Sequence, residues 1–568
     1  MTHRLDRRLR SSLPPLLALL WSGTPASGQG LSKVSLADHG GEANGPSTSR
    51  SLSGDGARVA FWSDASDLLL LDTNGASDVF VRDRKTGQLT LVSANTSGLP
   101  GNGSSSAPAL SGDGLRCAFV SSASDLVPGD ANGRQDVFLR DLVAGTTTLV
   151  SVSTAGVQGD GDSSGPWLDW DGDTVAFASL AKNLVSGDTN NFQDIFIRDL
   201  TAGTTSRESL SSAGVQGNGR SLRATLTHDG VLVCFASAAN NLVSGDGNNR
   251  SDCFVRDRAT GTTSRVSVAD AGHAGNDHSG DPEISGDGSV VVFDSLADNL
   301  VAGDTNLDSD VFLHDRAAAT TVRLSVDASG NEVDLDSVEA SVSADGNLVC
   351  FSSAATNLVP GDGNGVADVF VVERDRGLLT RISVAVDGSE ADAACINPQL
   401  ATDGYVAIFE SAATTLVAGD AAGTRDVFAH ATPEVGFVPY GSGLAGAGGY
   451  VPDLAGFGGR GNGDAGYAVE ITAGVGFAPG LLLIAGGQAS FPLFGGIGLV
   501  DFGLLLTAMP LLLGGRYGVP GDGELAFDGV DVTEVVDVSV YLQVLLIDAA
   551  APKGISMTNG LELMVIGR

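Results

Sequence analysis

Short hydrophobic runs alternate with glycine-rich polar segments over residues 31–431. The first copy of this pattern has runs at 58–62, 78–82 and 89–93, and a further run, such as 108–111, precedes each Asp-Gly turn. The runs are rich in β-branched and aromatic residues, and Gly, Asn, Asp and Ser separate them. No 3.6-residue periodicity of helical length interrupts the pattern. It therefore predicts short strands joined by tight turns.

The pattern repeats at one fixed step, which is the separation of Phe80 from Phe138 in the sequence. Two phenylalanine columns and a column of Asp-Gly pairs, beginning at Asp55-Gly56, keep this step through seven copies without an insertion. A fixed period indicates a repeat architecture. Seven copies of four strands predict an all-β fold, a seven-bladed β-propeller, with a linear solenoid as the alternative. The phenylalanine columns are Phe61, Phe119, Phe177, Phe235, Phe293, Phe351 and Phe409, and Phe80, Phe138, Phe196, Phe254, Phe312, Phe370 and Phe428.

The two ends of the repeat region complement each other. One period before Ser93 lies Ser35, within segment 32–36, whereas the last copy ends after Phe428 without a fourth strand. We therefore expect the N-terminal segment to supply the missing strand of the last blade and to close the ring. A solenoid gives no reason to divide one repeat in this way. The serine column that marks the fourth strands is Ser93, Ser151, Ser209, Ser267, Ser325 and Ser383.

Three segments of the copies resemble the repeats of a known family. The stretches "SGDGARVAF" at 53–61, "DVFVRDRKTG" at 78–87 and "DIFIRDLTAGTTS" at 194–206 resemble TolB-like β-propeller repeats, which are WD40-like. The resemblance covers the seven copies. It implies a non-enzymatic scaffold for protein interactions at the cell envelope or surface. Each copy departs from the family pattern by a long insertion of the type "GDTNNFQD" at 187–194.

Residues 1–28 have the features of an export signal. A basic segment that contains Arg4 and Arg10 precedes an apolar run at 13–21, and small residues at 26–28 form a cleavage site. The apolar run is too short for a membrane span. We therefore predict a bacterial Sec-type signal peptide at 1–28, a propeller at 29–432 and no transmembrane segment in the mature chain. The expected location is periplasmic, cell-surface or extracellular.

The charge of the chain excludes some classes of partner. The sequence has 32 Lys and Arg against 68 Asp and Glu, a formal net charge of −36. Loss of the predicted signal, with its four Arg and Asp6, would bring the charge to about −39. Such a chain is not expected to bind nucleic acid or anionic membranes through its overall field. Cations, basic proteins and neutral glycans stay open, and the sequence does not identify the protein or glycan partner.

Each copy carries Asp, one residue, Asn, three residues and Asp between its second and third strands, with Ala422 in place of Asn in the seventh copy. Oxygen-bearing side chains on a glycine-rich loop suit a hard cation, and Ca²⁺ is the one cofactor that the sequence suggests. The alternative is that Asp and Asn close Asx turns and cap loop amides. The candidate calcium ligands are Asp72, Asn74, Asp78, Asp130, Asn132, Asp136, Asp188, Asn190, Asp194, Asp246, Asn248, Asp252, Asp304, Asn306, Asp310, Asp362, Asn364 and Asp368.

Established catalytic motifs are absent from the sequence, which has no His-Glu-x-x-His, Gly-x-Ser-x-Gly, phosphate-binding Gly-Lys-Ser or Cys-x-x-Cys segment. His273, Asp277, His278 and Asp281 lie in one loop and could chelate a transition metal, with surface histidines as the simpler interpretation. We expect no catalytic residues and a scaffold that binds a protein or another ligand. The alternative is a secreted hydrolase or lyase that acts on polysaccharide, because carboxylate pairs are abundant.

The period ends at Pro433, and residues 433–568 are rich in Gly and Leu. Gly, Pro and Asp interrupt the apolar runs, so none reaches the length of a membrane helix. This composition predicts a small C-terminal β-sandwich. The stretch "FVPYGSGLAGAGGYVP" at 437–452 and the segment 558–562 are similar to a Gly-rich C-terminal module of secreted bacterial proteins.

Five cysteines are too few for a disulfide scaffold in a chain of 568 residues. Cys234 and Cys253 each precede a phenylalanine of the two columns, on strands that we expect to be neighbours. A cross-strand disulfide is compatible with this placement. Buried packing is favoured, because Ala118 and Val137 take the same positions in another copy.

Overall fold

The computed structural model describes residues 30–432, except 71, 271, 386 and 421–422, together with the backbone of strands between 437 and 565. The predicted signal peptide lies outside the described residues. No helix occurs in the described residues, and accordingly none of membrane-spanning length and hydropathy.

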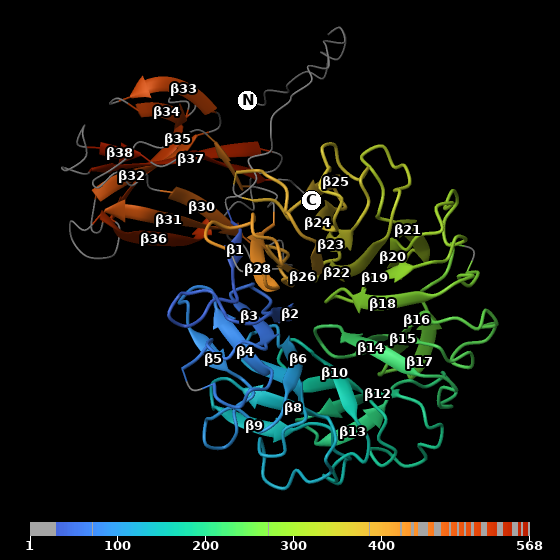
Figure 1. Ribbon diagram of the computed structural model, residues 1–568. Helices are drawn as coiled ribbons and strands as arrows, with labels where there is room; N and C mark the ends of the chain where they lie inside the picture. Colours follow the sequence, from blue (N-terminus) through green and yellow to red (C-terminus); the bar gives the residue numbers. More distant parts are fainter. Residues whose placement is uncertain are drawn as a thin grey trace, which may run out of the picture.

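Seven four-stranded antiparallel sheets surround a central axis (Figure 1). In the first blade, β2 (Ser47–Leu52) lies nearest the axis, followed outward by β3 (Arg58–Ser63), β4 (Asp78–Asp83) and β5 (Leu89–Leu91). This architecture confirms the predicted seven-bladed propeller. Blades 2 to 6 repeat the arrangement in β6 (Ser105–Leu110), β7 (Arg116–Ser121), β8 (Asp136–Asp141) and β9 (Thr146–Leu149); β10 (Ser163–Leu168), β11 (Thr174–Ser179), β12 (Asp194–Asp199) and β13 (Thr204–Arg207); β14 (Ser221–Leu226), β15 (Leu232–Ser237), β16 (Asp252–Asp257) and β17 (Thr262–Arg265); β18 (Ser279–Ile284), β19 (Val290–Ser295), β20 (Asp310–Asp315) and β21 (Thr320–Arg323); and β22 (Ser337–Val342), β23 (Leu348–Ser353), β24 (Asp368–Glu373) and β25 (Leu378–Arg381).

The seventh blade joins the two ends of the repeat region. It consists of β26 (Cys395–Leu400), β27 (Val406–Ser411), β28 (Asp426–Ala431) and the N-terminal strand β1 (Ser32–Lys33). Strand β1 pairs with β28 in antiparallel register, and the N–H of Val34 donates to the carbonyl of Val427 at 2.7 Å. The prediction that the N-terminal segment closes the ring is therefore confirmed.

The two phenylalanine columns meet in the centre of every blade. Phe61 of β3 lies directly opposite Phe80 of β4, and their ring centroids are 5.7 Å apart. All seven pairs stack at 5.7 to 5.9 Å, and the rings are buried. Aromatic pairs at this distance add about 0.5–1.5 kcal/mol to the effect of area burial. Each period of the sequence thus contributes one stacked phenylalanine pair to one blade.

A belt of backbone hydrogen bonds joins the turns between the first and second strands at one end of the axis. The N–H of Gly54 donates to the carbonyl of Gly112, and five further bonds lead round to the bond from the N–H of Asp403 to the carbonyl of Gly54. Trp170 lies in this belt and packs against His228 with ring centroids 4.7 Å apart. A Cβ atom at Gly112 would lie 2.2 Å from the Trp170 ring, so glycine is required there.

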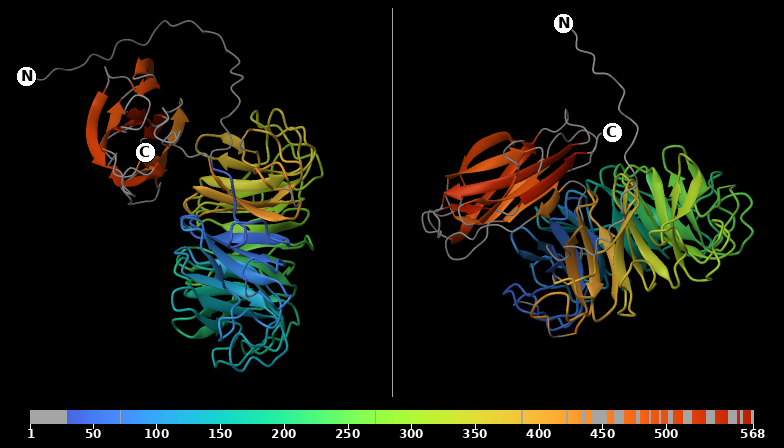
Figure 2. Two further views of the ribbon diagram at one scale, coloured as in Figure 1. Left: turned by 60° about the vertical axis from the view of Figure 1, so that its left-hand side comes forward. Right: turned by 90° about the horizontal axis from the view of Figure 1, so that it is seen from above.

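Eleven further strands follow the ring, and Figure 2 shows them as a group separate from the blades. They form one sheet of six strands, one of three and one of two. A β module is therefore observed, while its packing as a two-layer sandwich stays a prediction. The strands are β29 (Phe437–Tyr440), β30 (Asp453–Gly458), β31 (Tyr467–Val475), β32 (Pro479–Ala485), β33 (Gln488–Leu493), β34 (Gly496–Val500), β35 (Leu505–Leu512), β36 (Pro520–Val530), β37 (Val538–Ile547), β38 (Ile555–Met557) and β39 (Gly560–Val565).

Candidate functional site

The segments from the first to the last Asp of each copy, such as 72–78, are called carboxylate loops below. They share one face of the ring with the loops that connect successive blades, and we call this the loop face. In blade 1 the side-chain amide of Asn74 donates to the carbonyl of Gly101 in the connecting loop at 2.9 Å. The equivalent bond occurs in blades 2 to 6. The two sets of loops therefore hold each other in place, as the strand order predicts.

The last Asp of each carboxylate loop is buried and fixes the third strand to the fourth. Asp426 is 1% exposed, and its Oδ1 accepts a hydrogen bond from Ser35 Oγ at 2.7 Å. Ser35 Oγ in turn accepts from the N–H of Val427 at 3.0 Å. The same Asp–Ser pair occurs in all seven blades. The serine column thus supplies a buried hydrogen bond in every blade as well as marking a strand.

The Asn of each carboxylate loop turns its oxygen toward the backbone. Asn74 Oδ1 accepts the N–H of Ala76 at 2.9 Å, and this assigns its amide nitrogen to the opposite side, where it donates to Asp78 Oδ2 at 2.7 Å. The Oδ1 capping bond occurs in six loops. This geometry is that of an Asx turn. The calcium prediction itself is not tested by it, but the Asn oxygen points away from the two carboxylates.

A side-chain cation lies between the two Asp residues in five of the seven blades. In blade 3, Arg207 Nη1 is 3.2 Å from Asp188 Oδ1 and 3.4 Å from Asp194 Oδ2. The cation is always the last residue of the outermost strand. The five are Arg207, Arg265, Arg323, Arg381 and Lys33.

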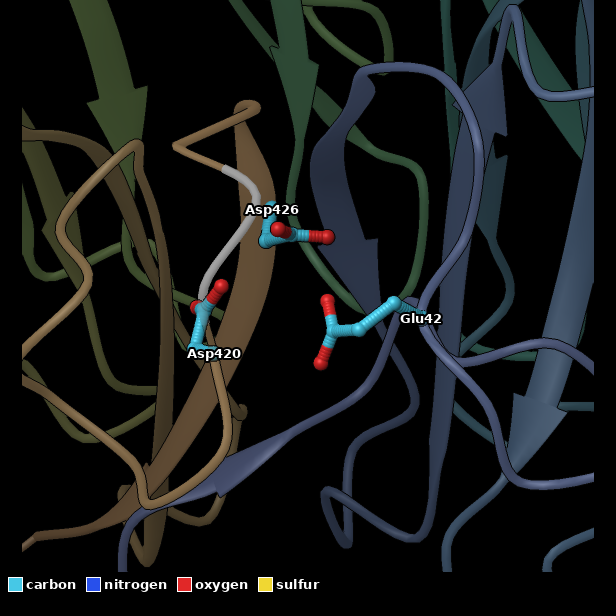
Figure 3. A group of neighbouring side chains, drawn as sticks. All are labelled: Glu42, Asp420 and Asp426. Atoms are coloured by element: carbon cyan, nitrogen blue, oxygen red, sulfur yellow. The ribbon is translucent and has the colours of Figure 1, made fainter.

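A third carboxylate joins the pair in blades 5, 6 and 7. Figure 3 shows Glu42, Asp420 and Asp426 of blade 7 pointing toward one another. Three carboxylates this close could bind a metal ion. However, Lys33 Nζ lies 3.3 Å from Asp420 and 2.8 Å from Asp426, and it also contacts Glu42. The N-terminal strand therefore supplies its own cation to this cluster. Glu332 and Glu390 bond to Arg323 and Arg381 in the same way.

Blades 1 and 2 are exceptions, because Leu91 and Leu149 end their outermost strands. In blade 2, Gln158 Nε2 donates to Asp130 Oδ1 at 2.7 Å and to Asp136 Oδ2 at 3.0 Å, so a neutral amide bridges the pair. In blade 1 the position of Gln158 is taken by Pro100, one period earlier. Burial, together with the negative charge of Asp72, raises the pKa of Asp78 to about 6.

The cation column was not anticipated from the sequence. Its signal is present there, because each of the four arginines lies two residues before a serine of the serine column, as Arg207 does before Ser209. Leu91 and Leu149 in two copies, and the separate position of Lys33 near the N-terminus, conceal the column in a simple alignment of copies.

Residues that differ between the copies gather round the axis, as Trp167, Glu283 and Gln399 of one repeat column do. Glu283 of β18 is buried and accepts bonds from Ser341 Oγ at 2.9 Å, the N–H of Val342 at 3.0 Å and Gln399 Nε2 at 2.8 Å. Burial raises the pKa of Glu283 to about 7. These bonds join the inner strand of blade 5 to those of blades 6 and 7, and bonds to Ser51 and Thr225 join other neighbouring blades. Ser51, Glu283 and Gln399 border a partly open space of about 80 Å³.

The remaining candidates from the sequence are the histidine loop and the possible disulfide. His278 Nδ1 accepts the N–H of Ser251 at 3.0 Å, and neither His273 nor His278 belongs to a cluster of potential metal ligands among the described residues. All five cysteines are buried and free, so Cys234 and Cys253 are not bonded. In the strand register Cys253 lies opposite Ala236 rather than Cys234.

Solved β-propellers share this architecture. The chain is similar to TolB. TolB from Acinetobacter baumannii is 14% identical over 66% of this chain and 80% of its own, with a TM-score of 0.32. A TolB structure from Agrobacterium tumefaciens is 16% identical over 49% of this chain and 80% of its own, with a TM-score of 0.31.

Enzymes are also among the similar structures. A prolyl endopeptidase is 12% identical over 76% of this chain and 56% of its own, with a TM-score of 0.42. Each of these TM-scores is below 0.5, so the propeller architecture rests on the sheets described above. No family model and no curated protein matches the chain.

Proposed function

We propose that this protein is an exported, non-enzymatic β-propeller scaffold that binds a protein or glycan partner through its loop face, in the periplasm, at the cell surface or outside the cell. The observation that carries the proposal is a set of exposed apolar side chains on this face. Of fourteen large hydrophobic residues that are exposed in the described residues, nine lie on the loop face. They are Leu70, Leu99, Val157, Leu180, Phe192, Val215, Leu296, Leu307 and Leu335.

Rigid loops with exposed apolar tips are typical of binding surfaces. Phe192 is 43% exposed and Leu307 is 77% exposed, and both lie on carboxylate loops that buried Asp and Ser residues fix. The surrounding acidic residues disfavour an anionic partner. A basic or neutral partner surface that also offers apolar groups therefore suits this face best.

The experiment is a comparative capture from envelope and culture-supernatant fractions. The bait proteins are the full chain, the double variant Phe192→Asp and Leu307→Asp, and the control Val143→Asp, whose position is 76% exposed and lies outside the loop face. We expect one partner that the full chain and the control retain and the double variant loses. A partner bound equally by all three would contradict the loop-face proposal.

The alternative function, a hydrolase or lyase acting on polysaccharide, draws support from the polar residues at the axis. Two observations weigh against it. A space of about 80 Å³ is far smaller than the 300–1,000 Å³ of ordinary organic ligand sites. Glu283 is also held by three hydrogen bonds that join blades, so its oxygens are engaged.

We expect no saturable turnover by the purified full chain on panels of glycans, esters and peptides. Turnover that persists through purification and is abolished by Glu283→Gln, with the melting temperature unchanged, would establish the enzymatic alternative instead.

Calcium belongs to the proposal as a stabilising ligand of the carboxylate loops. The ion pairs make calcium binding less favourable in some blades than in others. Where Arg or Lys already lies between the two Asp residues, a metal ion would have to displace it. Blades 1 and 2 have no such residue, and in blade 2 the amide of Gln158 takes its place.

A further inference from the structure

The seven blades provide an internal comparison of one structural position. Five blades place a cation from the end of the outermost strand between two carboxylates, and blade 2 places Gln158 of the following connecting loop between them. Blade 1 has Leu91 at this position and Pro100 in place of Gln158. Neither residue can donate a side-chain hydrogen bond or compensate a negative charge.

The carboxylates of blade 1 are nevertheless as buried as those of the other blades. Asp72 is 8% exposed and Asp78 is fully buried. Among the described residues, no Lys, Arg or His forms an ion pair with either of them. Asp72 Oδ2 is buried and has no hydrogen-bond partner. In blades 2 and 3 one nitrogen atom, of Gln158 or Arg207, lies within 3.4 Å of both equivalent carboxylates, so the repeat places Asp72 and Asp78 around the same position.

Ser93 and Asn74 donate hydrogen bonds to Asp78, but neither carries a charge. Two buried carboxylates close together are costly unless their charge is neutralised. Five blades solve this problem with a cation at this position, and blade 2 solves it with the side-chain amide of Gln158. Because the chain supplies none in blade 1, a cation from solution is the equivalent solution. The available ligands are carboxylate oxygens on an irregular loop, which suit Ca²⁺ better than Mg²⁺ with its strict octahedral geometry.

We propose that blade 1 binds one Ca²⁺ between Asp72 and Asp78, at the position that Arg207 Nη1 takes in blade 3. Asp72 Oδ2 and Asp78 Oδ2 are its side-chain ligands, and water or backbone carbonyls complete its shell. This inference narrows the calcium part of the proposed function from six loops to one. It does not depend on a partner at the loop face, because its readouts are metal content and stability.

The test measures Ca²⁺ binding and thermal stability of the full chain, and then of variants in which one blade receives the residue of another. The full chain is freed of metal with a chelator, and Ca²⁺ binding is measured by calorimetry in a titration that reaches millimolar concentrations. Thermal melts are recorded in chelator, in Ca²⁺, in Mg²⁺ and in NaCl of equal ionic strength. We expect one Ca²⁺ per chain, and a melting temperature about 3 °C higher in Ca²⁺ at a hundredfold excess over Kd than in matched NaCl.

Two variants should change the number of bound Ca²⁺ ions in opposite directions. Leu91→Arg installs the cation of the other blades, so it should abolish Ca²⁺ binding and raise the melting temperature in chelator. Arg265→Leu, in a blade where Ala274 leaves no bridging amide, should raise the stoichiometry from one Ca²⁺ to two. Equal melting of the full chain in Ca²⁺ and matched NaCl with no bound Ca²⁺ would overturn the proposal. So would a Leu91→Arg chain that binds Ca²⁺ like the original.

Discussion

Replacing Lys33 by leucine would give the ring-closing blade the residue that blades 1 and 2 carry as Leu91 and Leu149. The side chain of Lys33 is 3% exposed and lies between Asp420 and Asp426, whose side chains are 2% and 1% exposed. At an effective dielectric constant of about 20, charges 2.8 and 3.3 Å apart attract by about 6 and 5 kcal/mol. Most of this attraction offsets the desolvation of the three groups.

Removing one member of a buried ion pair typically costs about 3–5 kcal/mol, because the partner charge is left unpaired. We expect Lys33→Leu to cost this amount near pH 7. For about 400 residues that unfold together, with an entropy of about 2.1 cal/mol/K per residue, the loss lowers the melting temperature by about 5 °C. Native-state hydrogen exchange should show the loss first in β28, since β1 is its outer neighbour.

The pH dependence follows from the same charges. Burial alone would favour the neutral amine, but hydrogen bonds to Asp426 and Glu42 and the charges of Asp426 and Asp420 outweigh it and raise the pKa of Lys33 above its usual value. The stabilisation by Lys33 is therefore complete below that usual value and lost as the pH rises through the raised pKa. In Lys33→Leu the pKa of Asp420, which burial already raises, rises further, so the variant should differ less from the original in acid than at pH 7. The difference should decline again above the raised pKa of Lys33.

Two controls accompany this measurement. Lys33→Arg keeps the charge and should cost little, because Arg ends the outermost strand in four other blades. Lys85→Leu removes an exposed lysine whose pairing with Asp55 is worth well under 1 kcal/mol. Melting of Lys33→Leu within 1 °C of Lys85→Leu, at pH 7 and at pH 5 alike, would refute the reasoning about the buried cation.

Three further predictions concern other parts of the ring. Deleting residues 31–37 removes β1 and exposes the edge of β28, so we expect aggregation or loss of a cooperative melt, detected by light scattering; a melt like that of the full chain would be inconsistent with strand-mediated closure. Trp170→Ala should cost about 1–3 kcal/mol in thermal melts through lost contacts with His228 and Gly112, whereas Val143→Ala should be neutral. The five cysteines should react with a thiol reagent only in denaturant, because they are buried and burial raises the pKa of thiols such as Cys117; rapid reaction of the native chain would contradict their placement.

The repeat made the fold predictable. An undisturbed period through seven copies indicates that one unit was copied, and a stacked phenylalanine pair per unit satisfies the same packing requirement in every blade. The division of one repeat between the two chain ends could also be found by extending the serine column back to Ser35. Such features are periodic in the sequence because each blade buries its core in the same way.

The carboxylate loops illustrate what a sequence pattern leaves open. The Asp-x-Asn-x₃-Asp spacing is equally compatible with a metal site and with an Asx turn, because both use oxygen atoms on a tight loop. The distinction lies in which atom faces which, and the structure shows Asn74 Oδ1 on the turn amide and Asn74 Nδ2 on Asp78.

By itself, the sequence determined the number of blades, the strands of each blade and the way in which the ring closes, because these follow from local pattern and copy number. Only the tertiary structure decided what lies between the carboxylates, since the partner of Asp420 is Lys33, at the opposite end of the repeat region. It also decided which residues meet at the axis, where Glu283 contacts side chains of two later blades. A linear repeat specifies each blade separately, whereas closure of the ring determines the neighbours at its centre and at its seam.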